Sequence, residues 1–463
     1  MPDAFHPPPR EDLFVIPRRD DQYYLYAPLR RSVAVINSAA AAAVAAYLEQ
    51  GESALSPPAS TAIRALREGG LLGDPIPTPP LFPENYVFCP HEVTLFPTSR
   101  CNLRCRYCYA DAGRKSIDMP WNVAQAAIDL VATNAGLMGL RKFGVGFHGG
   151  GEPTVAWETV VHCTEYARAK AQEKGLEVDV YAATNGLLSD AKLQFIVEHF
   201  STVNISLDGP PDVQDYNRPR AGGGGSYAQV SRSMKFFDAH RFFYGIRATI
   251  TAGTAGRMAE TVRWIMSQFR PGYLHLEPAW LCGRCTTTGE TPPADDVFAE
   301  NFLKAVEAGR ELGIDVHYSG ARLDVLTSKF CAAPGDGFTM LPEGIVTSCF
   351  EVSEPSDARA DIFHYGRYDA ATGTIVFDSQ RIAALQAMSV DNLPFCGNCF
   401  CKWHCAGDCL AKVFARSGSS THCGSSRCEL NRALTTAQLE RLVQGELPLA
   451  GPQQGDEHGR HAG

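Results

Sequence analysis

The chain has 463 residues, of which 45% are hydrophobic and 20% charged, and this balance excludes disorder as its main state. At roughly 100–200 residues per domain, it should hold about two to four domains. The 42 Lys and Arg against 51 Asp and Glu give a net charge of −9, which favours neither nucleic acid nor an anionic membrane as a partner. No apolar run reaches the ~18 residues that span a bilayer. Residues 1–14 lack the apolar segment of a secretory signal, so we expect a cytoplasmic protein.

Residues 1–80 differ in composition from the rest of the chain. Strand-like stretches, broken by Pro and by charges, run from Leu13 to Val33. Helical patterns follow at Ser38–Leu48 and Ser60–Glu68. The Pro-rich segment Gly73–Pro83 is typical of an extended linker. This pattern predicts a small separate unit at the N-terminus.

From His91 to about Asp315, strand-like runs alternate with helical ones. The predicted strands are Glu92–Phe96, Phe143–Phe147, Val178–Ala182, Val203–Leu207, Gly245–Ile250 and Tyr273–Glu277. The predicted helices include Val123–Thr133, Trp157–Lys174, Asp190–Phe200, Tyr227–Ala239 and Met258–Gln268. Six such units in about 225 residues predict an α/β fold, a partial (β/α)6 TIM-like barrel rather than a complete eight-fold one. In such folds the chemistry gathers where strands end and loops begin.

After about Val316 the helical runs become fewer, and glycines, short strands and cysteines become more frequent. A last helix is predicted at Glu429–Gln444, and the polar tail beyond it should be disordered. We therefore expect four parts: an N-terminal domain with its linker at 1–83, the barrel at 84–315, a cysteine-rich domain at 316–445 and a tail at 446–463.

The chain contains 16 cysteines, too few for a short disulfide scaffold and more than a cytoplasmic protein usually keeps as inert thiols. Cys101, Cys105 and Cys108 form a C-x3-C-x2-C run in the loop after the first predicted strand. Three soft thiolates this close together suit an iron–sulfur cluster. A structural zinc ion usually takes four protein ligands, and no fourth ligand is near. One metal would therefore keep an open coordination position.

This cysteine run, with Tyr107 before its last member, resembles the signature of the radical S-adenosylmethionine (SAM) enzymes. The resemblance implies a [4Fe–4S] cluster whose open iron binds SAM and whose electron cleaves SAM to a 5′-deoxyadenosyl radical. It also assigns SAM contacts to residues at or after successive strand ends. The GGEP-like element after the second strand would contact the SAM amino group, and residues of the fourth and fifth strands would contact its ribose and carboxylate. These residues are Gly150, Gly151, Glu152, Pro153, Asn185, Ser206, Asp208, Arg218 and Arg247.

The C-terminal cysteines resemble those of the SPASM domain, an extension of one branch of the radical SAM enzymes that carries auxiliary iron–sulfur clusters. The resemblance assigns Cys331, Cys349 and Cys409 to a first cluster. It assigns a second cluster to Cys396, Cys399, Cys405 and Cys428, with Cys423 as the alternative to Cys428. With three ligands, the first cluster could have an open site, a carboxylate ligand or two irons only. A zinc-binding domain remains the alternative reading of this region.

A second C-x2-C pair, Cys282 and Cys285, lies just past the sixth strand and encloses Gly283 and Arg284. We expect no metal role for this pair. The alternative is that one of its thiols binds a metal or faces the substrate.

Two features bear on the substrate. Glu351 lies two residues past Cys349, where some family members place a catalytic acid, although here Phe350 directly follows the cysteine. Glu351 is our candidate catalytic base, and a surface or structural carboxylate is the alternative. The N-terminal unit resembles the small peptide-recognition domain of many peptide maturases, which holds a leader peptide by adding it as a strand at a sheet edge. A plain structural extension is the alternative.

The favoured hypothesis is a radical SAM/SPASM maturase that forms a thioether, a carbon–carbon cross-link or an oxidised residue in a ribosomally made precursor peptide. It would need a precursor peptide or protein as substrate and a reductant such as a flavodoxin or ferredoxin. An anaerobic sulfatase-type maturase that forms formylglycine is the second hypothesis; such enzymes usually lack the N-terminal domain and would have a carboxylate directly after Cys349. A non-catalytic iron–sulfur electron carrier or sensor is the third.

Overall fold

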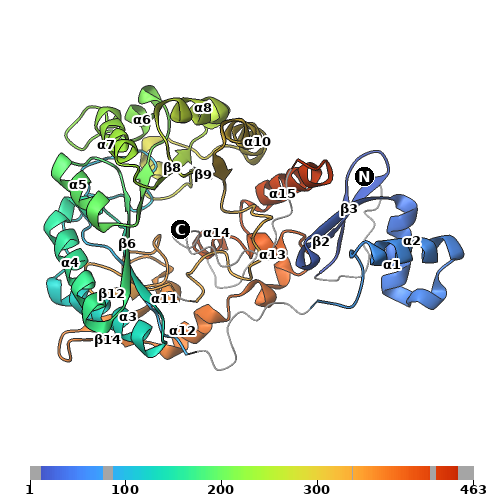
Figure 1. Cartoon of the computed structure of the whole chain (residues 1–463), viewed down its shortest axis with the longest axis horizontal. Coiled ribbons are helices and arrows are strands. Elements are labelled where there is room, and N and C mark those ends of the chain that lie inside the picture. The colour runs from blue at the N-terminus through green and yellow to red at the C-terminus, as the bar shows by residue number, and fades with distance from the viewer. Residues whose placement is uncertain (1–11, 77–86, 336, 418–423, 447–463) are drawn as a thin grey trace. The chain divides into compact units, whose positions relative to one another are not determined.

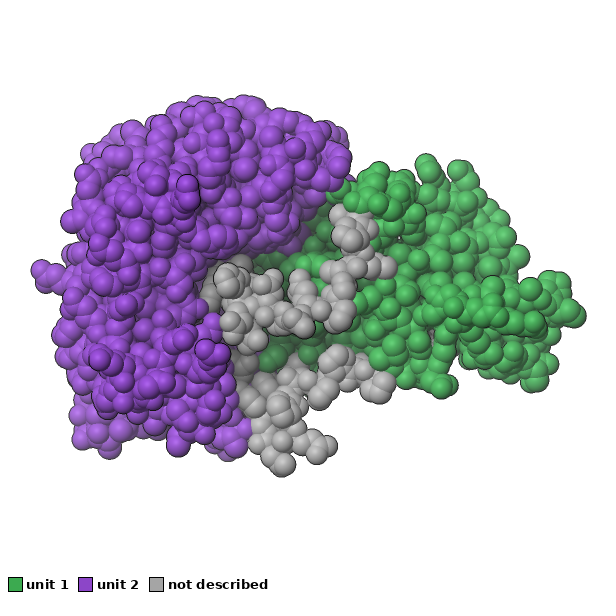
Figure 2. All heavy atoms as spheres, in the orientation of Figure 1, with its two compact units in different colours: residues 1–86, 319–331, 388–463 green, residues 87–318, 332–387 purple. Residues whose placement is uncertain are grey.

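The computed structural model describes residues 12–76, 87–335, 337–417 and 424–446. The chain divides into two compact units (Figure 2). Unit 1 contains residues 1–86, 319–331 and 388–463, and unit 2 contains residues 87–318 and 332–387. Residues 316–445, which the sequence groups into one domain, thus contribute to both units. The predicted domain boundaries stay a prediction. None of the described helices is both long and apolar enough to cross a membrane.

The core of unit 2 is a run of six parallel strands, each hydrogen-bonded to the next in chain order (Figure 1). They are β4 (Glu92–Leu95), β5 (Lys142–Phe147), β6 (Glu177–Thr184), β7 (Thr202–Ser206), β8 (Tyr244–Ile250) and β9 (Tyr273–Pro278). The helices that connect or follow them are α3 (Trp121–Leu137), α4 (Trp157–Lys174), α5 (Asp190–His199), α6 (Pro211–Asn217), α7 (Tyr227–Ala239), α8 (Met258–Gln268), α9 (Cys285–Thr288) and α10 (Asp295–Leu312). The predicted partial barrel is confirmed.

The strands have one apolar and one polar face because successive side chains point to opposite sides. In β9, Leu274 and Leu276 are buried on one side, while His275 and Glu277 share the other. The Tyr273 hydroxyl donates a hydrogen bond to Asn204 Oδ1 at 2.5 Å, from β9 to β7 across the intervening strand β8. The polar face therefore lines the interior of the barrel, and the apolar face packs under the helices.

The sheet extends beyond these six strands at both edges. Strand β10 (Asp315–His317) pairs with β9 in parallel, and β11 (Thr339–Met340) pairs with β4 in parallel. An antiparallel run then adds β12 (Ile345–Thr347), β13 (His364–Asp369) and β14 (Thr374–Phe377), joined to short helices α11 (Ala360–Phe363) and α12 (Ser379–Gln386). Strands β10 and β14 are the two ends of this 11-stranded sheet, so the barrel is open.

Unit 1 contains the small N-terminal sheet that the sequence predicts. Its antiparallel strands are β1 (Phe14–Pro17), β2 (Gln22–Ala27) and β3 (Ser32–Asn37), in that order. They are followed by α1 (Ser38–Gln50) and α2 (Pro57–Glu68), and the C-terminal part of unit 1 contributes α13 (Lys402–Cys405), α14 (Leu410–Ser417) and α15 (Cys428–Val443). The Pro-rich linker and the tail lie largely outside the described residues.

This sheet has two buried faces. Leu25, Ala27 and Ile36 pack in one core with the residues of α1 and α2. Tyr24 and Tyr26, which alternate with them along β2, pack with Leu439 of α15. Period-2 alternation thus places the strands between two helical layers.

An ion pair reinforces the contact with α15. Arg18 donates to both carboxylate oxygens of Glu440, with Nε–Oε2 at 2.8 Å and Nη2–Oε1 at 2.6 Å, and the Tyr24 hydroxyl also donates to this carboxylate. The hydrogen bond from Arg18 is the main reason why the pKa of Glu440 falls to about 2. The carboxylate therefore stays charged at physiological pH, and the sheet and α15 are joined by an apolar core with a charged pair beside it.

Replacing Leu439 with Ala should loosen the sheet from α15. This side chain is fully buried, and a Leu→Ala change in a core costs about 2–5 kcal/mol. We expect faster hydrogen exchange of the β2 amides, measured by mass spectrometry. The control is Leu137→Ala, because Leu137 is 80% exposed. Equal exchange in the two variants would contradict the packing described.

Candidate active site

The three predicted cluster cysteines lie in one loop, residues 98–118, directly after β4; we call it the cysteine loop. A bridge between Thr98 and Asp118 closes its base. The end of α6 and the segment after it support the middle of the loop, since Arg104 N donates to Pro219 O at 2.8 Å and Arg106 N donates to Asn217 O at 2.9 Å. The loop is therefore held by backbone contacts with a segment that lies more than a hundred residues later in the chain.

The thiols in this loop are suited to iron. Leu103 N–H points at Cys101 Sγ at 3.4 Å, and Ala112 N–H points at Cys108 Sγ at 3.5 Å. Burial raises the pKa of Cys101 to about 11 and that of Cys105 to about 12. These thiols therefore stay protonated until a metal displaces the protons. Hydrogen bonds to ligand sulfurs are one means by which proteins tune iron–sulfur clusters.

Among the described residues, no group of three His, Cys, Asp or Glu side chains forms a single-ion site. The assignment of Cys101, Cys105 and Cys108 to an iron–sulfur cluster stays a prediction.

Glu152 joins the ends of β5 and β6. Its carboxylate is almost fully buried and accepts hydrogen bonds from Thr154 Oγ1, Thr184 Oγ1 and Asn185 N, each at 2.7 Å. Asn185 Nδ2 in turn donates to Asn102 Oδ1 of the cysteine loop at 2.7 Å. Two predicted SAM-binding residues, Glu152 and Asn185, are therefore brought together with the loop.

Residue 151 must be a glycine because the backbone of the cysteine loop approaches it closely. A Cβ at Gly151 would lie 2.3 Å from Arg100 O and 2.6 Å from Thr98 O, both in the cysteine loop. Glu152 N donates to Arg100 O at 2.8 Å at the same point. Pro153 follows as the first residue of a short 3-10 helix, and Gly150 faces the adjoining pocket. The GGEP-like element therefore lies directly against the start of the cysteine loop.

Asp208 is a second buried carboxylate that joins several segments. It is 1% exposed, and it accepts from Arg218 Nε, Asn217 Nδ2 and Thr249 N, each at 3.0 Å, and from the Tyr107 hydroxyl. Tyr107 belongs to the cysteine loop, and Arg218 lies over its ring at 5.3 Å. The structure thus pairs Asp208 with Arg218 and ties both to the loop.

Ser206 and Arg247 face the interior of the barrel as register neighbours on β7 and β8. Burial and the charge of Arg247 together lower the pKa of His148, at the end of β5, to about 4, and lower that of His275 equally. Both imidazoles are therefore neutral at physiological pH. The charge of Arg247 thus acts on both histidines.

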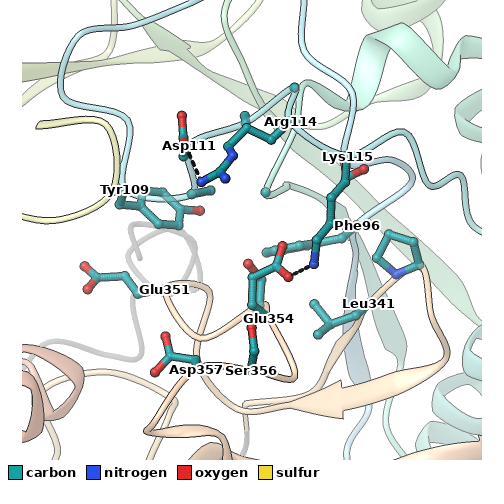
Figure 3. A pocket seen from close by; sticks show the side chains of 18 of the residues that line it. Phe96, Tyr109, Asp111, Arg114, Lys115, Leu341, Glu351, Glu354, Ser356 and Asp357 are labelled. Atoms are coloured by element: carbon teal, nitrogen blue, oxygen red, sulfur yellow. Dashed lines mark hydrogen bonds and ion pairs between the residues drawn. The ribbon is translucent and has the colours of Figure 1, made fainter. Parts of the chain in front are cut away.

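A pocket of about 560 Å³ opens beside the cysteine loop (Figure 3). Its wall includes Phe96 and Tyr109, the Cys282–Gly283 turn, and the segment from Glu351 to Arg359. Figure 3 shows Glu351 beside Tyr109 at one side and the Lys115–Glu354 ion pair at the other. The structure places Glu351 at a cavity; its role as a base stays a prediction.

His148 is a residue that the sequence analysis did not select. Its ring stacks on Phe350 with centroids 4.6 Å apart, and Phe96 lies 5.8 Å away. Phe350 directly follows Cys349, so an aromatic side chain occupies the position where a sulfatase-type maturase would have a carboxylate. The sequence alone does not distinguish a histidine beside a candidate site from a histidine buried in an ordinary core.

Four of the predicted auxiliary-cluster cysteines lie together in unit 1. The charge of Cys399 contributes to raising the pKa of its neighbours Cys396, Cys405 and Cys428. Asn431 Nδ2 donates to Cys405 Sγ at 3.2 Å, and Ser425 N donates to Cys428 Sγ at 3.2 Å. A hydrogen bond from Cys401 lowers the pKa of Cys399. These residues fit a second cluster with four thiolates.

All of the auxiliary-cluster assignments stay predictions. Cys331 and Cys409 belong to unit 1 and Cys349 to unit 2, so a shared cluster is not tested by the structure of either unit. Cys423, the alternative to Cys428, lies outside the described residues. The Cys285 thiol is buried and donates to Glu290 O at 3.1 Å, in keeping with a structural role.

Comparisons with known proteins agree with this architecture. Residues 95–262 match the model of the radical SAM superfamily. The serine-type anaerobic sulfatase-maturating enzyme of Klebsiella aerogenes is 24% identical over 343 residues, which cover 70% of this chain and 80% of that protein. The cysteine-type enzyme of Clostridium perfringens is 26% identical over 174 residues, which cover 36% of this chain and 46% of that protein.

Two solved structures share the fold. The structure titled native anSMEcpe with bound AdoMet aligns with a TM-score of 0.61 at 18% identity, over 77% of this chain and 99% of that chain. Streptococcus suis SuiB bound to its precursor peptide SuiA aligns with a TM-score of 0.52 at 14% identity, over 91% of this chain and 99% of that chain.

Residues 95–262, which contain the cysteine loop and strands β5 to β8, form a radical SAM domain, and the chain is an enzyme.

Replacing Asp208 with Asn should destabilise the barrel, because it leaves the Arg218 guanidinium buried without its counter-ion. Removing one partner of a buried ion pair costs about 3–5 kcal/mol. The free energy of unfolding of the apoprotein, from urea titration, measures the effect. The control is Asp190→Asn: its ion pair with Arg232 is exposed, and loss of such a pair costs about 1 kcal/mol or less. Equal losses would show that the Asp208 pair does not organise the site.

Proposed function

We propose that the chain is a radical SAM peptide maturase. It cleaves SAM reductively and takes a hydrogen atom from a ribosomally made precursor peptide, giving a thioether, a carbon–carbon cross-link or an oxidised residue. The observation that carries the proposal is the arrangement of the cysteine loop. Two buried carboxylates, Glu152 and Asp208, tie this loop to the carboxyl ends of β5 to β8, which is where the class binds SAM.

The residues of the chain take the following roles in this proposal. Cys101, Cys105 and Cys108 hold the [4Fe–4S] cluster, which supplies the electron for SAM cleavage when bound and is itself reduced by a flavodoxin or ferredoxin. Ser206 and Arg247, which face the barrel interior, contact SAM. Glu152 and Asp208 act by holding the cysteine loop, since most of their hydrogen-bonding capacity is already used within the protein.

The auxiliary clusters complete the proposed machinery. Cys396, Cys399, Cys405 and Cys428 hold the cluster in unit 1, and Cys331, Cys349 and Cys409 hold the other. Glu351, in the pocket wall beside Tyr109, remains the candidate base.

The N-terminal sheet supports a peptide substrate. Among the described residues, no strand pairs with the outer edge of β3, and Val35 on that strand is 37% exposed. Such an edge can accept a further strand from a leader peptide. The SuiB alignment spans 91% of the chain, against 77% for anSMEcpe. The additional coverage favours a maturase with an N-terminal domain over a sulfatase-type enzyme.

The sulfatase-type reaction is the second candidate. The identity to the Klebsiella enzyme extends over 70% of the chain, and the TM-score to anSMEcpe is 0.61. The residue after Cys349 argues against the sulfatase-type reaction, because Phe350 is apolar and stacks on His148. A precursor peptide is therefore the favoured substrate.

The deciding experiment uses anaerobically reconstituted protein with SAM and dithionite. The candidate substrates are the peptide encoded by the short reading frame nearest to the gene and a sulfatase-derived peptide. We expect 5′-deoxyadenosine together with a mass change in the precursor only. A mass change in the sulfatase peptide alone would establish the second candidate. Absence of 5′-deoxyadenosine from fully loaded protein would refute both and leave an electron carrier.

Replacing Cys101, Cys105 and Cys108 together with Ala should abolish 5′-deoxyadenosine formation, because the electron donor to SAM is lost. Chromatography of the reaction measures the product. Cys89→Ala is the matched control and should keep full activity, since no cluster is assigned to Cys89. Persistent turnover in the triple variant would remove these cysteines from the mechanism.

Val35→Asp should weaken binding of the precursor peptide by about tenfold, or ~1.4 kcal/mol, because a charge at a strand edge opposes strand addition. Fluorescence anisotropy with the labelled precursor measures the dissociation constant. The control is Val376→Asp, on the end strand β14 of the other sheet, where Val376 is 48% exposed. Unchanged affinity in the Val35 variant would place the leader elsewhere.

A further inference from the structure

We propose that Arg284 is a positioning residue for the radical SAM cluster. Its guanidinium clamps the part of the cysteine loop that carries Cys105 and Cys108, and so holds these ligands in place. Arg284 lies just after β9, between the two cysteines of the Cys282–Cys285 pair.

Four hydrogen bonds join Arg284 to the loop. Its backbone N donates to Cys108 O at 2.9 Å. In the side chain, Nη1 donates to Cys105 O at 3.0 Å, Nη2 to Ala112 O at 2.7 Å, and Nε to Asp111 Oδ1 at 2.9 Å. The acceptors belong to residues on both sides of Cys108, and two of them belong to cluster cysteines. The clamp therefore fixes the backbone of the ligands themselves.

The neighbouring residues make this approach possible. Gly283 has φ +52°, and a Cβ there would lie 2.3 Å from both Cys108 O and Tyr109 O. Only glycine fits so close to another backbone in this conformation. Asp111 also adopts a positive φ, of 44°, which Asp tolerates better than most residues. The turn and the loop are therefore shaped to meet each other.

A second tie from the same segment holds the loop between the two cysteines. Thr288 Oγ1 donates to Arg106 O at 2.7 Å, and Arg106 Nε pairs with Glu290 Oε1 at 2.9 Å. Residues 283–290 thus contact the loop at Cys105, Arg106, Cys108 and Ala112. This gives the Gly and the Arg between Cys282 and Cys285 a role that needs no metal ion.

Ala112 connects the clamp to a ligand sulfur. Its carbonyl accepts from Arg284 while its N–H points at Cys108 Sγ, at 3.5 Å. Release of Arg284 would free Ala112 and weaken this N–H···S contact. Because such contacts stabilise the thiolate and tune the cluster, the clamp acts on cluster affinity as well as on loop shape.

The planar guanidinium is needed because one side chain must reach three acceptors that diverge from it. A lysine ammonium carries the same charge on a single atom and lacks this fork. The clamp is also largely shielded from water, since the Arg284 side chain is 13% exposed and that of Asp111 29%. Arg284→Lys should therefore fail to replace it.

The test measures how fast the reconstituted holoenzyme loses its radical SAM cluster to an iron chelator. The readout is the electron paramagnetic resonance signal that changes when SAM is added. This signal separates the radical SAM cluster from any auxiliary cluster, and no peptide is needed, so the result does not depend on the proposed substrate. Loss of outer contacts to metal ligands typically costs 10–100-fold in metal affinity. We expect Arg284→Met and Arg284→Lys to lose the cluster about tenfold faster, and Asp111→Asn to lie between them and the wild type.

The matched control is Arg114→Met. Arg114 pairs with the other oxygen of Asp111 at 3.2 Å (Figure 3), but its side chain is 79% exposed. It should keep the wild-type rate. A wild-type rate in Arg284→Lys, or equal losses in Arg284→Met and Arg114→Met, would overturn the proposal. Circular dichroism of the apoproteins shows whether Arg284→Met has unfolded; in that case Arg284→Lys alone decides.

Discussion

The site depends on buried carboxylates placed at the ends of parallel strands. Asp208 and Glu152 each accept hydrogen bonds from several segments that are distant in the sequence. Burying a charge is costly unless it is paired or well hydrogen-bonded. Asp208 meets this condition through Arg218. Glu152 accepts hydrogen bonds from hydroxyl and backbone donors, which offset part of the burial that raises the pKa of its carboxyl. The same bonds that compensate for burial therefore also fix the cysteine loop against β5, β6 and β7.

The contacts around these carboxylates explain why the loop can hold three cysteines without regular secondary structure. Tyr107 reaches Asp208 from inside the loop, and Asn102 reaches Asn185. On the opposite side, the Gly283–Arg284 turn meets the backbone at Cys105 and Cys108. The loop is thus supported by the ends of β6, β7 and β9 at once. Its shape is a property of the whole barrel.

Much of the barrel could be predicted from the sequence because short strand-like runs alternate regularly with helical ones from His91 to about Asp315. Helices α4, α7 and α8 begin and end where the pattern predicts. The weak points were short strands such as β11, which has two residues and is defined by its pairing with β4 rather than by its own composition. Arg284 could not be assigned either, because its partners lie some 170 positions away and a Gly-Arg pair alone indicates only a turn. The positions of Glu152 and Asp208 were predicted, but their many internal partners were not.

Helix α15 contacts both the cysteines of unit 1 and the N-terminal sheet. Its first turns contact thiols: Cys428 is its first residue, Asn431 donates to Cys405, and the charge of Arg432 acts on Cys399. Its last turns hold the N-terminal sheet through Leu439 and Glu440. The two ends of this helix therefore contact the N-terminal sheet and the proposed ligands of the auxiliary cluster. The sheet that we propose to hold the leader and the cysteines that we propose to hold iron belong to one packed unit, in which Phe400 and Leu29 add further apolar contacts between the two parts.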